Sequence, residues 1–430
     1  MILIRDPLWD TITLDDAAVS IVDSAAFQRL RYIRQLGLAH LVYPGATHTR
    51  FDHAIGVYHL AQQALRLLDA RGALRPVAEP DRRIVAYAAL LHDIGHYPFS
   101  HALEELEQER IPEHHEALVG HFLSDPAVRG ALLGVGGNGP AAVEALVRGR
   151  SDNPLQGLVA GSLDLDKIEY LKRDARFCGV PYGEVDVDRL LNALVLVPDP
   201  ATGRWEIGVR EKGVAALESL LFAKYQMFRN VYWHHAVRAA TVMYKRIVAD
   251  ALALGVLSAE ELVGLTDEGL LYLLEARAPE IARQITALRQ RKLPKRAAEI
   301  AAAHLGENHD VAEWVSADGE TKRAVEAALA RELAVNDGWV HLDYPEKKAM
   351  FGLNILVERR SGEVLRLGPA GESGLIGLPR VADELYRTAR VLRVFVWGKR
   401  VQLAPDAVVR LAVLPEAEVQ ARLRSGGLLS

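Results

Sequence analysis

Residues 90–105, LLHDIGHYPFSHALEE, constrain the fold of this 430-residue chain more than any other stretch. An apolar run before them predicts a buried helix that ends at His92 and Asp93. A glycine and a proline then break the helix, which lets His96 and His101 turn back toward this pair. Imidazole nitrogens and carboxylate oxygens suit Fe, Mn, Zn or Co, and such a mixed set favours a hydrolytic site over a closed structural zinc site. The alternative is an aspartate that caps a helix beside a core histidine.

The first fifty residues predict two short strands and a helix. ILIRDPLWDTITL reads as two extended segments joined by a turn, and residues 17–37 carry apolar side chains at helical spacing before a glycine stop. Three arginines of this helix are expected on its solvated face: Arg29, Arg31 and Arg34.

A second helix is predicted over residues 51–72, and its first turn contains His53. Arg50 lies three residues before His53, so a metal ligand and a phosphate-binding guanidinium can face one cavity. The alternative is a surface histidine near a helix end, which is also the interpretation given to His48 and His59.

A later segment, GSLDLDKIEYLKRDARFCG, predicts a helix. It contains more acidic residues than a helix that packs in a core usually does. Asp166 and Asp174 are eight residues apart, a little over two turns, and therefore lie near one face. A charged, solvated face would explain this helix alone. Together with His53, His92 and Asp93, however, Asp166 completes a set of metal-ligand residue types on three successive helical segments.

Charge and cysteine content narrow the class of protein. The formal net charge is -5, so the chain lacks the basic field on which non-specific nucleic-acid binding depends, and a nucleic-acid partner is not expected. The single cysteine, Cys178, excludes an intramolecular disulfide and fits a reducing compartment. No window offers about 18 uninterrupted apolar residues, and the chain begins without a charged leader. We expect a soluble, cytoplasmic protein without a membrane partner.

The remaining segments add structure but no further catalytic set. A strand–turn–strand hairpin is predicted over residues 193–209, followed by one long helix over 213–255. Amphipathic helices are expected between residues 258 and 335, and the basic run 289–296 is interpreted as a solvated loop. The glycine-rich stretch 132–140 lacks a preceding strand and a GK[ST] sequence, so we interpret it as a flexible connection.

Six motifs, in this order, make the chain resemble a known family: DSAAFQRLRYIRQLG, YPGATHTRFDHAIGV, LLHDIGHYPFSH, HEALVG, LDLDKIEYLKRD and AKYQMFRNVYWHHAV. They resemble the motifs of the HD-domain deoxynucleoside triphosphate triphosphohydrolases. The chain is most similar to the bacterial branch related to the vertebrate SAM-and-HD-domain enzyme, without its SAM domain. The motifs span roughly residues 1–240.

We expect a mainly α fold with an HD-domain helical core, minor β-hairpins and a small α+β C-terminal domain. The segments WVHLDYP, GLNILVER, LRVFVWG and VVRLAVL read as strands separated by glycine and proline. The predicted domains are an HD phosphohydrolase core over residues 1–250, a helical extension over 251–335 and the small domain over 336–430.

The resemblance implies a divalent metal, which could be Mn, Fe, Mg or Co. The positions that match its ligands are His53, His92, Asp93 and Asp166. Four protein ligands leave coordination positions for a water and a phosphate oxygen. The positions that match the family's acid/base cluster are His96, Glu104 and His115. A histidine oriented by a carboxylate can give or take a proton near neutral pH.

Further matched positions would bind a deoxynucleoside triphosphate. The positions that match the triphosphate cradle are Arg50, His101, Lys167 and Lys224. The positions that match the sugar pocket are Gln35, Leu36, Tyr170, Asp174 and Tyr232. Of these, the pair Gln35 and Leu36 matches residues that disfavour a 2′ hydroxyl. Tyr170 and Asp174 match the pair that receives the 3′ hydroxyl.

Family members often carry a second, activating nucleotide site at subunit contacts. The positions that match it are Asp23, Gln28, Arg31, Arg189 and His234. The family's residues at the extreme N-terminus are replaced here by Ile2 and Arg5, and its His-Gly pair by Trp9 and Asp10. The resemblance thus implies an activating dNTP or GTP and a homo-oligomer, a tetramer or a dimer, with part of the activator site altered.

The activity that the resemblance implies is hydrolysis of dNTPs to a deoxynucleoside and inorganic triphosphate, through attack of a metal-activated water on the α-phosphorus. Two alternatives stay open. An HD phosphatase or phosphodiesterase acting on another nucleotide would use the same ligand types. A catalytically silent sensor would bind a nucleotide without turnover.

Overall fold

The computed structural model describes residues 1–106, 111–136, 138–306, 310–317, 319–345, 352–368 and 375–429. In this part of the chain the fold is mainly α, which confirms the prediction, and the strands form small sheets. None of the described helices combines the length and the apolar composition needed to cross a bilayer. Contacts divide the chain into two compact units that alternate along the sequence. Unit 1 contains residues 1–97, 113–227 and 349–381, and unit 2 contains residues 98–112, 228–348 and 382–430.

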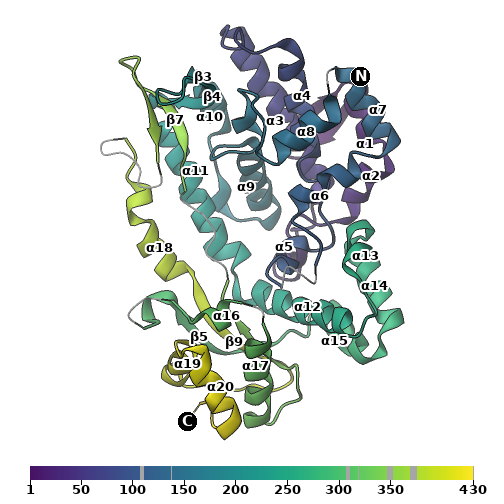
Figure 1. The fold of residues 1–430 in the computed structure, drawn as a ribbon, viewed down its shortest axis with the longest axis vertical. Helices are drawn as coiled ribbons and strands as arrows, with labels where there is room; N and C mark the ends of the chain where they lie inside the picture. Colours follow the sequence, from purple (N-terminus) through teal and green to yellow (C-terminus); the bar gives the residue numbers. More distant parts are fainter. Residues whose placement is uncertain are drawn as a thin grey trace. The chain divides into compact units, whose positions relative to one another are not determined.

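Unit 1 is a helical body in which α3 packs against both α4 and α9 (Figure 1). Its helices are α1 (Asp16–Val22), α2 (Ala25–Gln28), α3 (Arg50–Ala70), α4 (Glu79–Leu91), α6 (His115–Phe122), α7 (Pro126–Val135), α8 (Gly139–Val147), α9 (Leu165–Cys178), α10 (Val187–Ala193) and α11 (Val214–Met227). Its strands are β1 (Ile2–Asp6), β2 (Asp10–Leu14), β3 (Leu194–Pro198), β4 (Trp205–Arg210), β7 (Ile355–Glu358) and β8 (Val364–Leu367).

Both hairpins predicted in the first 210 residues are present. β1 pairs antiparallel with β2, and β3 pairs antiparallel with β4. β4 also pairs in parallel with β7, which continues the sheet to β8. The segment GLNILVER is therefore a strand, as predicted, and it belongs to unit 1. The division into three consecutive domains stays a prediction.

The helix expected over residues 17–37 is broken after Val22. The hydroxyl of Ser24 donates to the carbonyl of Ile21 at 2.6 Å and accepts from the N–H of Phe27 at 3.2 Å, so it ends one helix and caps the next. A short 3-10 turn, Arg29–Tyr32, then replaces the end of the predicted helix. Helical periodicity continues across the break, so periodicity alone does not reveal the serine cap.

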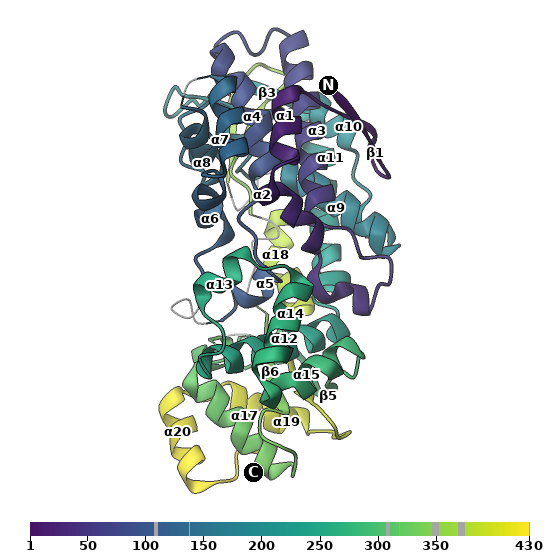
Figure 2. The ribbon, with the colours of Figure 1, turned by 90° about the vertical axis from the view of Figure 1, so that its right-hand side faces the viewer.

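Unit 2 holds the other described elements. Its helices are α5 (Ser100–Leu103), α12 (His235–Ala253), α13 (Ala259–Gly264), α14 (Asp267–Arg277), α15 (Pro279–Arg289), α16 (Glu313–Ser316), α17 (Glu320–Glu332), α18 (Ala382–Ala389), α19 (Pro405–Ala412) and α20 (Glu416–Ser425). Its strands, β5 (Lys295–Ala301), β9 (Val391–Val396) and β6 (Val340–Asp343), form one antiparallel sheet in the order β5–β9–β6. α17 packs against β6 and α20 (Figure 2).

The segment VVRLAVL is mostly helical, so its prediction as a strand was wrong. It lies largely in α19, where Pro405 occupies the first turn and its missing N–H removes no helical hydrogen bond. Val408, Leu411 and Ala412 are buried at helical spacing. A short apolar run does not reveal its period, which is why the two structures were confused.

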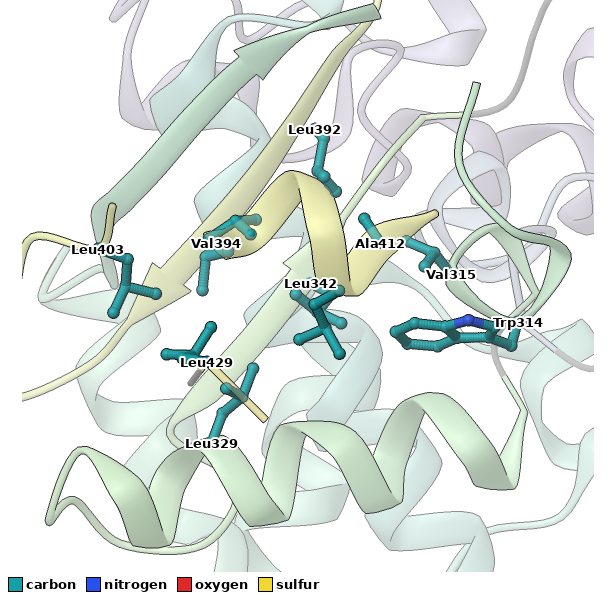
Figure 3. Close-up of a pocket in the computed structure, with 11 residues that line it drawn as sticks. Trp314, Val315, Leu329, Leu342, Leu392, Val394, Leu403, Ala412 and Leu429 are labelled. Carbon is teal, nitrogen blue, oxygen red and sulfur yellow. The ribbon is translucent and has the colours of Figure 1, made fainter. Parts of the chain in front are cut away.

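The core of unit 2 is apolar and closely packed. Leu342 of β6 and Val394 of β9 face Leu329 of α17 and Trp314 of α16 around a cavity of about 10 Å³ (Figure 3). This volume is at the lower limit for a single water, roughly 10–15 Å³, so it is a packing gap between side chains.

The long helix expected over residues 213–255 is interrupted. α11 ends at Met227, a π-helical turn spans Phe228–Tyr232, and α12 begins at His235. The interruption coincides with the change from unit 1 to unit 2. Short π-helical turns are rare and are frequently found at functional sites.

Candidate metal centre

Two helix starts in unit 1 position predicted ligands. The side chain of Thr49 caps α3 by accepting from the backbone N–H three residues later, which places His53 in the first turn. Asp164 caps α9 in the same way and places Asp166 in its first turn. Capping residues thus fix the register at which each ligand leaves its helix.

Three of the four predicted ligands, His53, His92 and Asp166, converge where α4 ends, and Asp93 lies beside His92. His53 Nε2 lies 3.2 Å from His92 Nε2 and 3.0 Å from Asp166 Oδ1. His92 Nε2 lies 3.6 Å from Asp166 Oδ1 and 3.3 Å from Asp93 Oδ1. His53, His92 and Asp93 are buried. Side chains from three helices therefore present nitrogen and oxygen atoms to a single point.

Hydrogen bonds on the far side of each imidazole determine which nitrogen faces this point. His92 Nδ1 lies 2.8 Å from the carbonyl oxygen of Ala89, and His53 Nδ1 lies 2.6 Å from Glu169 Oε2. Carbonyl and carboxylate oxygens only accept, so both Nδ1 atoms carry hydrogens and each neutral ring presents its Nε2 lone pair to the other. The two lone pairs then face each other and the Asp166 carboxylate, with the Asp93 carboxylate beside His92.

This donor set fits a divalent metal, because facing lone pairs and carboxylates repel unless a cation lies among them. The pKa shifts have the same origin. Burial disfavours the imidazolium form of His53, but hydrogen bonds with Asp166 and Glu169 outweigh it and raise the pKa of His53 to about 10. Without a metal the ring therefore holds a proton on Nε2 as well, and a metal would take the place of that proton. Burial alone would raise the pKa of Asp93, yet the neighbouring imidazoles and a guanidinium lower it well below its usual range. Asp93 is therefore ionised and able to bind a metal.

Glu169 supports the centre from behind. Besides His53, it accepts from Trp9 Nε1 at 2.9 Å and from Arg173 Nε at 2.7 Å. Arg173 in turn lies 3.0 Å from Asp6 Oδ2. These contacts fix the Glu169 carboxylate, which in turn orients the His53 ring. Hydrogen bonds of this kind keep metal-binding histidines in the correct orientation.

Gly56 allows the side chains of Glu169 and Arg173 to lie close to α3. A Cβ atom at Gly56 would lie 2.0 Å from Glu169 Oε1 and 2.8 Å from Arg173 Nη2. Both side chains are fully buried, so they have no free space into which to move. The close packing of α9 on α3 therefore requires glycine here.

Two arginines hold the loop that follows α4. Arg50 is buried and its Nη1 donates to Asp93 Oδ2 at 2.6 Å. Arg29 donates to the carbonyls of Ile94 and His96, each at 2.7 Å. The prediction of a solvated face was thus wrong for Arg29, because its guanidinium satisfies carbonyls that the broken helix leaves open. Burial lowers the pKa of Arg29 to about 10.

Two of the predicted acid/base residues stack beside the metal ligands. The rings of His96 and His115 have centroids 3.6 Å apart and are nearly parallel, at 19°. His96 Nε2 lies 3.1 Å from Asp93 Oδ1. Burial, reinforced by the charges of Arg50 and His115, lowers the pKa of His96 well below its usual range, so this ring is neutral at pH 7.

Four predicted residues belong to unit 2. Within that unit, His101 Nδ1 lies 3.0 Å from Glu104 Oε2. Tyr232 ends the π-helical turn, and His234 Nδ1 accepts from a backbone N–H at the start of α12 at 3.2 Å. The roles predicted for all four stay predictions.

The other two cationic residues of unit 1 that are predicted to bind the triphosphate, Lys167 and Lys224, come from α9 and α11. Lys167 pairs with Asp164 and donates to the carbonyl of Gly161 at 2.9 Å. Burial, followed by the charge of Lys167, lowers the pKa of Lys224 to about 8. The two ammonium groups are therefore close enough to influence each other, as a site for an anion requires.

The predicted sugar residues of unit 1 are at least partly buried. Asp174 Oδ1 lies 2.8 Å from His48 Nε2, so the interpretation of His48 as a surface residue was wrong. Burial raises the pKa of Tyr170 well above its usual range and keeps the phenol neutral. Gln35 Oε1 is buried without a hydrogen-bond partner among the described residues, and Leu36 precedes a short 3-10 turn.

The predicted activator residues of unit 1 are only partly assembled. Arg31 Nε donates to Gln28 Oε1 at 2.8 Å, and its guanidinium lies 3.4 Å above the ring of Phe51. Asp23 is exposed at the end of α1, and Arg189 donates to a backbone carbonyl at 3.1 Å. No hydrogen bond in the described part of the chain joins Asp23 or Arg189 to the other pair.

Comparison with known families matches two regions of the chain. The description "HD domain" matches residues 50–131, and "HD associated region" matches residues 185–375. The first match contains His53, His92 and Asp93, whereas Asp166 lies between the two matched regions.

Known proteins resemble the chain over about half of their length. An uncharacterized protein of Methanocaldococcus jannaschii is 34% identical over 279 residues, which is 64% of this chain and 55% of that protein. The human deoxynucleoside triphosphate triphosphohydrolase SAMHD1 is 29% identical over 266 residues, 54% of this chain and 42% of that protein. The chain thus spans about half the length of the curated relatives it matches. The crystal structure of a hypothetical protein from Aquifex aeolicus aligns with a TM-score of 0.70 and 27% identity, covering 92% of this chain and 96% of that one.

The hydrogen bond between Glu169 and His53 predicts that metal affinity depends on Glu169. Glu169→Gln keeps the side-chain shape but removes the carboxylate that orients the His53 ring, so we expect metal affinity to fall about 10- to 100-fold. Isothermal titration of the metal-free protein with Mn²⁺ measures this. Trp9→Phe removes only one of the donors to Glu169 and should reduce affinity less. Equal affinity in Glu169→Gln and the unmodified protein would contradict the role given to Glu169.

The close approach at Gly56 predicts a loss of stability. Gly56→Ala should lower the free energy of unfolding by about 1–3 kcal/mol, since the added methyl group overlaps buried Glu169. Gly130→Ala is the matched control, because nothing lies within 4 Å of its added Cβ in α7. This control should stabilise the chain by roughly 0.5–1 kcal/mol. Denaturant unfolding compares the two, and a stable Gly56→Ala protein would refute the packing argument.

Proposed function

We propose that this chain, which carries an HD domain followed by an HD-associated region, hydrolyses dNTPs to a deoxynucleoside and inorganic triphosphate with a divalent metal. The observation that carries the proposal is the convergence of the His53 and His92 imidazoles and the Asp166 carboxylate in one largely buried centre, with the Asp93 carboxylate 3.3 Å from His92. Mn, Fe and Co suit these nitrogen and oxygen donors, whereas Mg would depend mainly on the carboxylate oxygens. A metal held by His53, His92, Asp93 and Asp166 would act as a Lewis acid toward the substrate phosphate.

The cationic side chains near the centre support a polyphosphate substrate. A water molecule can reach phosphorus only when the negative charge of the phosphate oxygens is balanced. Arg50 lies beside Asp93, and Lys167 and Lys224 carry further positive charge from α9 and α11. Together they would hold the triphosphate in place and stabilise the charge that develops on it as the bond to the nucleoside breaks.

His96 supports the proton transfer. The oxygen of an attacking water forms a bond to the α-phosphorus, and the bond from phosphorus to the nucleoside 5′ oxygen breaks. Because His96 is neutral at pH 7, it can take up the proton that the attacking water releases. Asp93, 3.1 Å away, stabilises the charge that results. The proton then passes to the 5′ oxygen, which leaves as a hydroxyl. Glu104 and His115 complete the proposed acid/base group.

Sugar recognition is proposed from the group around Asp174. A 3′ hydroxyl both donates and accepts hydrogen bonds, which matches an ionised Asp174 held by His48 and a neutral Tyr170 that can donate its hydroxyl hydrogen. Leu36 has no polar group with which to satisfy a 2′ hydroxyl, which disfavours ribonucleotides.

We also propose that a dNTP or GTP activates a homo-oligomer, a tetramer or a dimer. The contact between Gln28 and Arg31 and the exposed carboxylate of Asp23 support a nucleobase site. A carboxylate can accept the hydrogens that guanine presents on its Watson–Crick edge. The changes at Trp9 and Asp10 alter the rest of that site, so activation is expected to be weaker or to use a different base.

Two other functions would use the same centre. A phosphatase or phosphodiesterase acting on another nucleotide would release orthophosphate or open an ester. A silent sensor would bind nucleotide tightly without turnover. The neighbouring ammonium groups of Lys167 and Lys224 favour the triphosphate substrate, since a monoester needs less positive charge.

Product analysis tests the proposal. Each dNTP and rNTP should be incubated with the purified protein and Mn, Mg, Co or Fe, alone and in mixtures, and the products resolved by ³¹P NMR. We expect inorganic triphosphate from dNTPs only, with turnover in mixtures if activation operates. Orthophosphate as the first product, or no product with any metal, would contradict the proposal.

Removal of one ligand predicts loss of both metal and turnover. Asp93→Asn keeps the size of the side chain but removes its charge, so bound metal should fall and dNTP hydrolysis should drop about 10²-fold or more. Metal content by mass spectrometry and the rate of triphosphate release measure the two effects. Asp188→Asn, an exposed change on α10, is the matched control and should retain both. Full activity of Asp93→Asn would be incompatible with the proposed ligand set.

The pKa of Lys224 predicts a pH dependence. This ammonium is charged below its pKa of about 8 and loses its charge as the pH rises through that value. Therefore kcat/KM for dNTPs, which reports on the free enzyme, should fall above about pH 8. In Lys224→Arg the guanidinium stays charged, so the fall should move to higher pH. An identical pH profile in both proteins would exclude Lys224 as its cause.

A further inference from the structure

Unit 2 contains a small polar cavity that has no part in the proposed catalysis. It lies where β6 packs against α12 and α17, and its volume is about 30 Å³. This is two to three times the roughly 10–15 Å³ that one water needs, and far below the several hundred ångströms cubed of a drug-sized pocket. The cavity can therefore hold a small ion but not a nucleoside.

Basic side chains dominate the lining of this cavity. Its ionisable residues are Lys245, Arg246, Lys322, Arg323, His341 and Glu326. Lys245 pairs with Glu105 at 3.0 Å and Arg246 pairs with Asp250 at 2.8 Å, but neither of these acids lines the cavity. Four cationic side chains, each of which also has an interaction partner, thus line the space together with a single carboxylate.

That carboxylate is already engaged by the backbone. Glu326 Oε1 accepts from the N–H of Leu342 at 2.8 Å, which ties α17 to β6. Lys245, Lys322 and Glu326 are all buried, so water screens their charges poorly. The positive potential inside the cavity is therefore stronger than the same groups would produce on the surface.

His341 provides an independent indication. Its side chain is 5% exposed, lines the cavity and makes no hydrogen bond to any described residue. Because no described side chain satisfies the His341 ring and its nitrogens are not fully enclosed, they open onto the cavity, where a ligand can accept from the N–H. Burial, followed by the charges of Arg246, Lys245 and Lys322, lowers the pKa of His341 to about 3. The ring is neutral, carries one N–H donor, and lies in a positive field.

We propose that this cavity binds a small oxyanion of the phosphate class. A tetrahedral anion offers acceptors in several directions, so it can accept from the ammonium and guanidinium groups and from the His341 N–H at once. Chloride is spherical and has no directed oxygens to match donors from three elements. The same chemistry is offered by inorganic phosphate and by the terminal phosphate of a longer chain such as triphosphate. The inference does not depend on the catalytic activity of unit 1.

Titration of the full-length protein with inorganic phosphate tests the inference. Isothermal titration calorimetry at constant ionic strength, held with sodium chloride, should detect one phosphate per chain in addition to any bound at the metal centre. Asp93→Asn serves as the background, so that the metal centre contributes least. Titration with inorganic triphosphate in the same background distinguishes free phosphate from the end of a longer chain.

Two charge-removing variants locate the binding. Lys322→Met keeps the apolar stem and removes the buried charge, and Arg323→Gln removes a charge from a partly exposed position that is less sensitive for folding. Each should weaken phosphate binding about tenfold or more, the usual effect of losing a hydrogen bond to a charged group. Arg331→Gln, exposed on the same helix and outside the cavity, is the matched control and should bind as before. Circular dichroism verifies that each variant folds.

The outcomes separate the possibilities. Binding that is lost in Lys322→Met and Arg323→Gln but retained in Arg331→Gln supports the site. Phosphate binding that is equal in all variants reflects non-specific attraction to surface charge and overturns the site. No detectable phosphate binding to the unmodified protein also overturns it. If Lys322→Met does not fold, Arg323→Gln alone decides between these outcomes.

Discussion

The centre of this protein depends on one electrostatic constraint, namely that the Nε2 lone pairs of His53 and His92 face each other and the Asp166 carboxylate, with the Asp93 carboxylate beside His92. The far sides of the rings are tied to Ala89 and Glu169, which leaves no neutral tautomer that could place a hydrogen between His53 and His92. Such an arrangement is stable only around positive charge, supplied by a metal or by protons. The ionised state of Asp93 follows from this arrangement, whereas burial and the charges of Arg50 and His115 keep the neighbouring His96 neutral.

The surrounding structure keeps these atoms in place by close backbone approaches. Gly56 allows α9 to pack on α3, and Gly95 lies where a Cβ atom would be 2.1 Å from the carbonyl oxygen of His115. The second approach brings α6 against the loop after α4, so that the His115 ring can stack on His96. Preorganised donors of this kind need no rearrangement when charge develops on a substrate.

The candidate ligands could be proposed from the sequence because few residue types bind metals, because helix caps and breakers mark where each one leaves its helix, and because the motifs resemble those of a known family. The supporting residues could not. Trp9, His48 and Arg29 act through partners that are 65 to 160 residues away in the chain, and no local pattern encodes such contacts. The same limit applies to the fold. The two hairpins and the helix expected over residues 51–72 were predicted correctly. The helices expected over residues 17–37 and 213–255 are interrupted, and a short apolar run in α19 was misread as a strand, because local sequence allows both structures.

The central claim is that one divalent metal occupies the point where these side chains meet. Anomalous diffraction from crystals grown with Mn²⁺ tests it most directly, since the signal locates the ion without reference to activity. The account predicts one strong peak in unit 1, about 2.0–2.3 Å from His53 Nε2, His92 Nε2 and oxygens of Asp93 and Asp166. A peak bound by other residues of unit 1, or no peak in that unit, would contradict it.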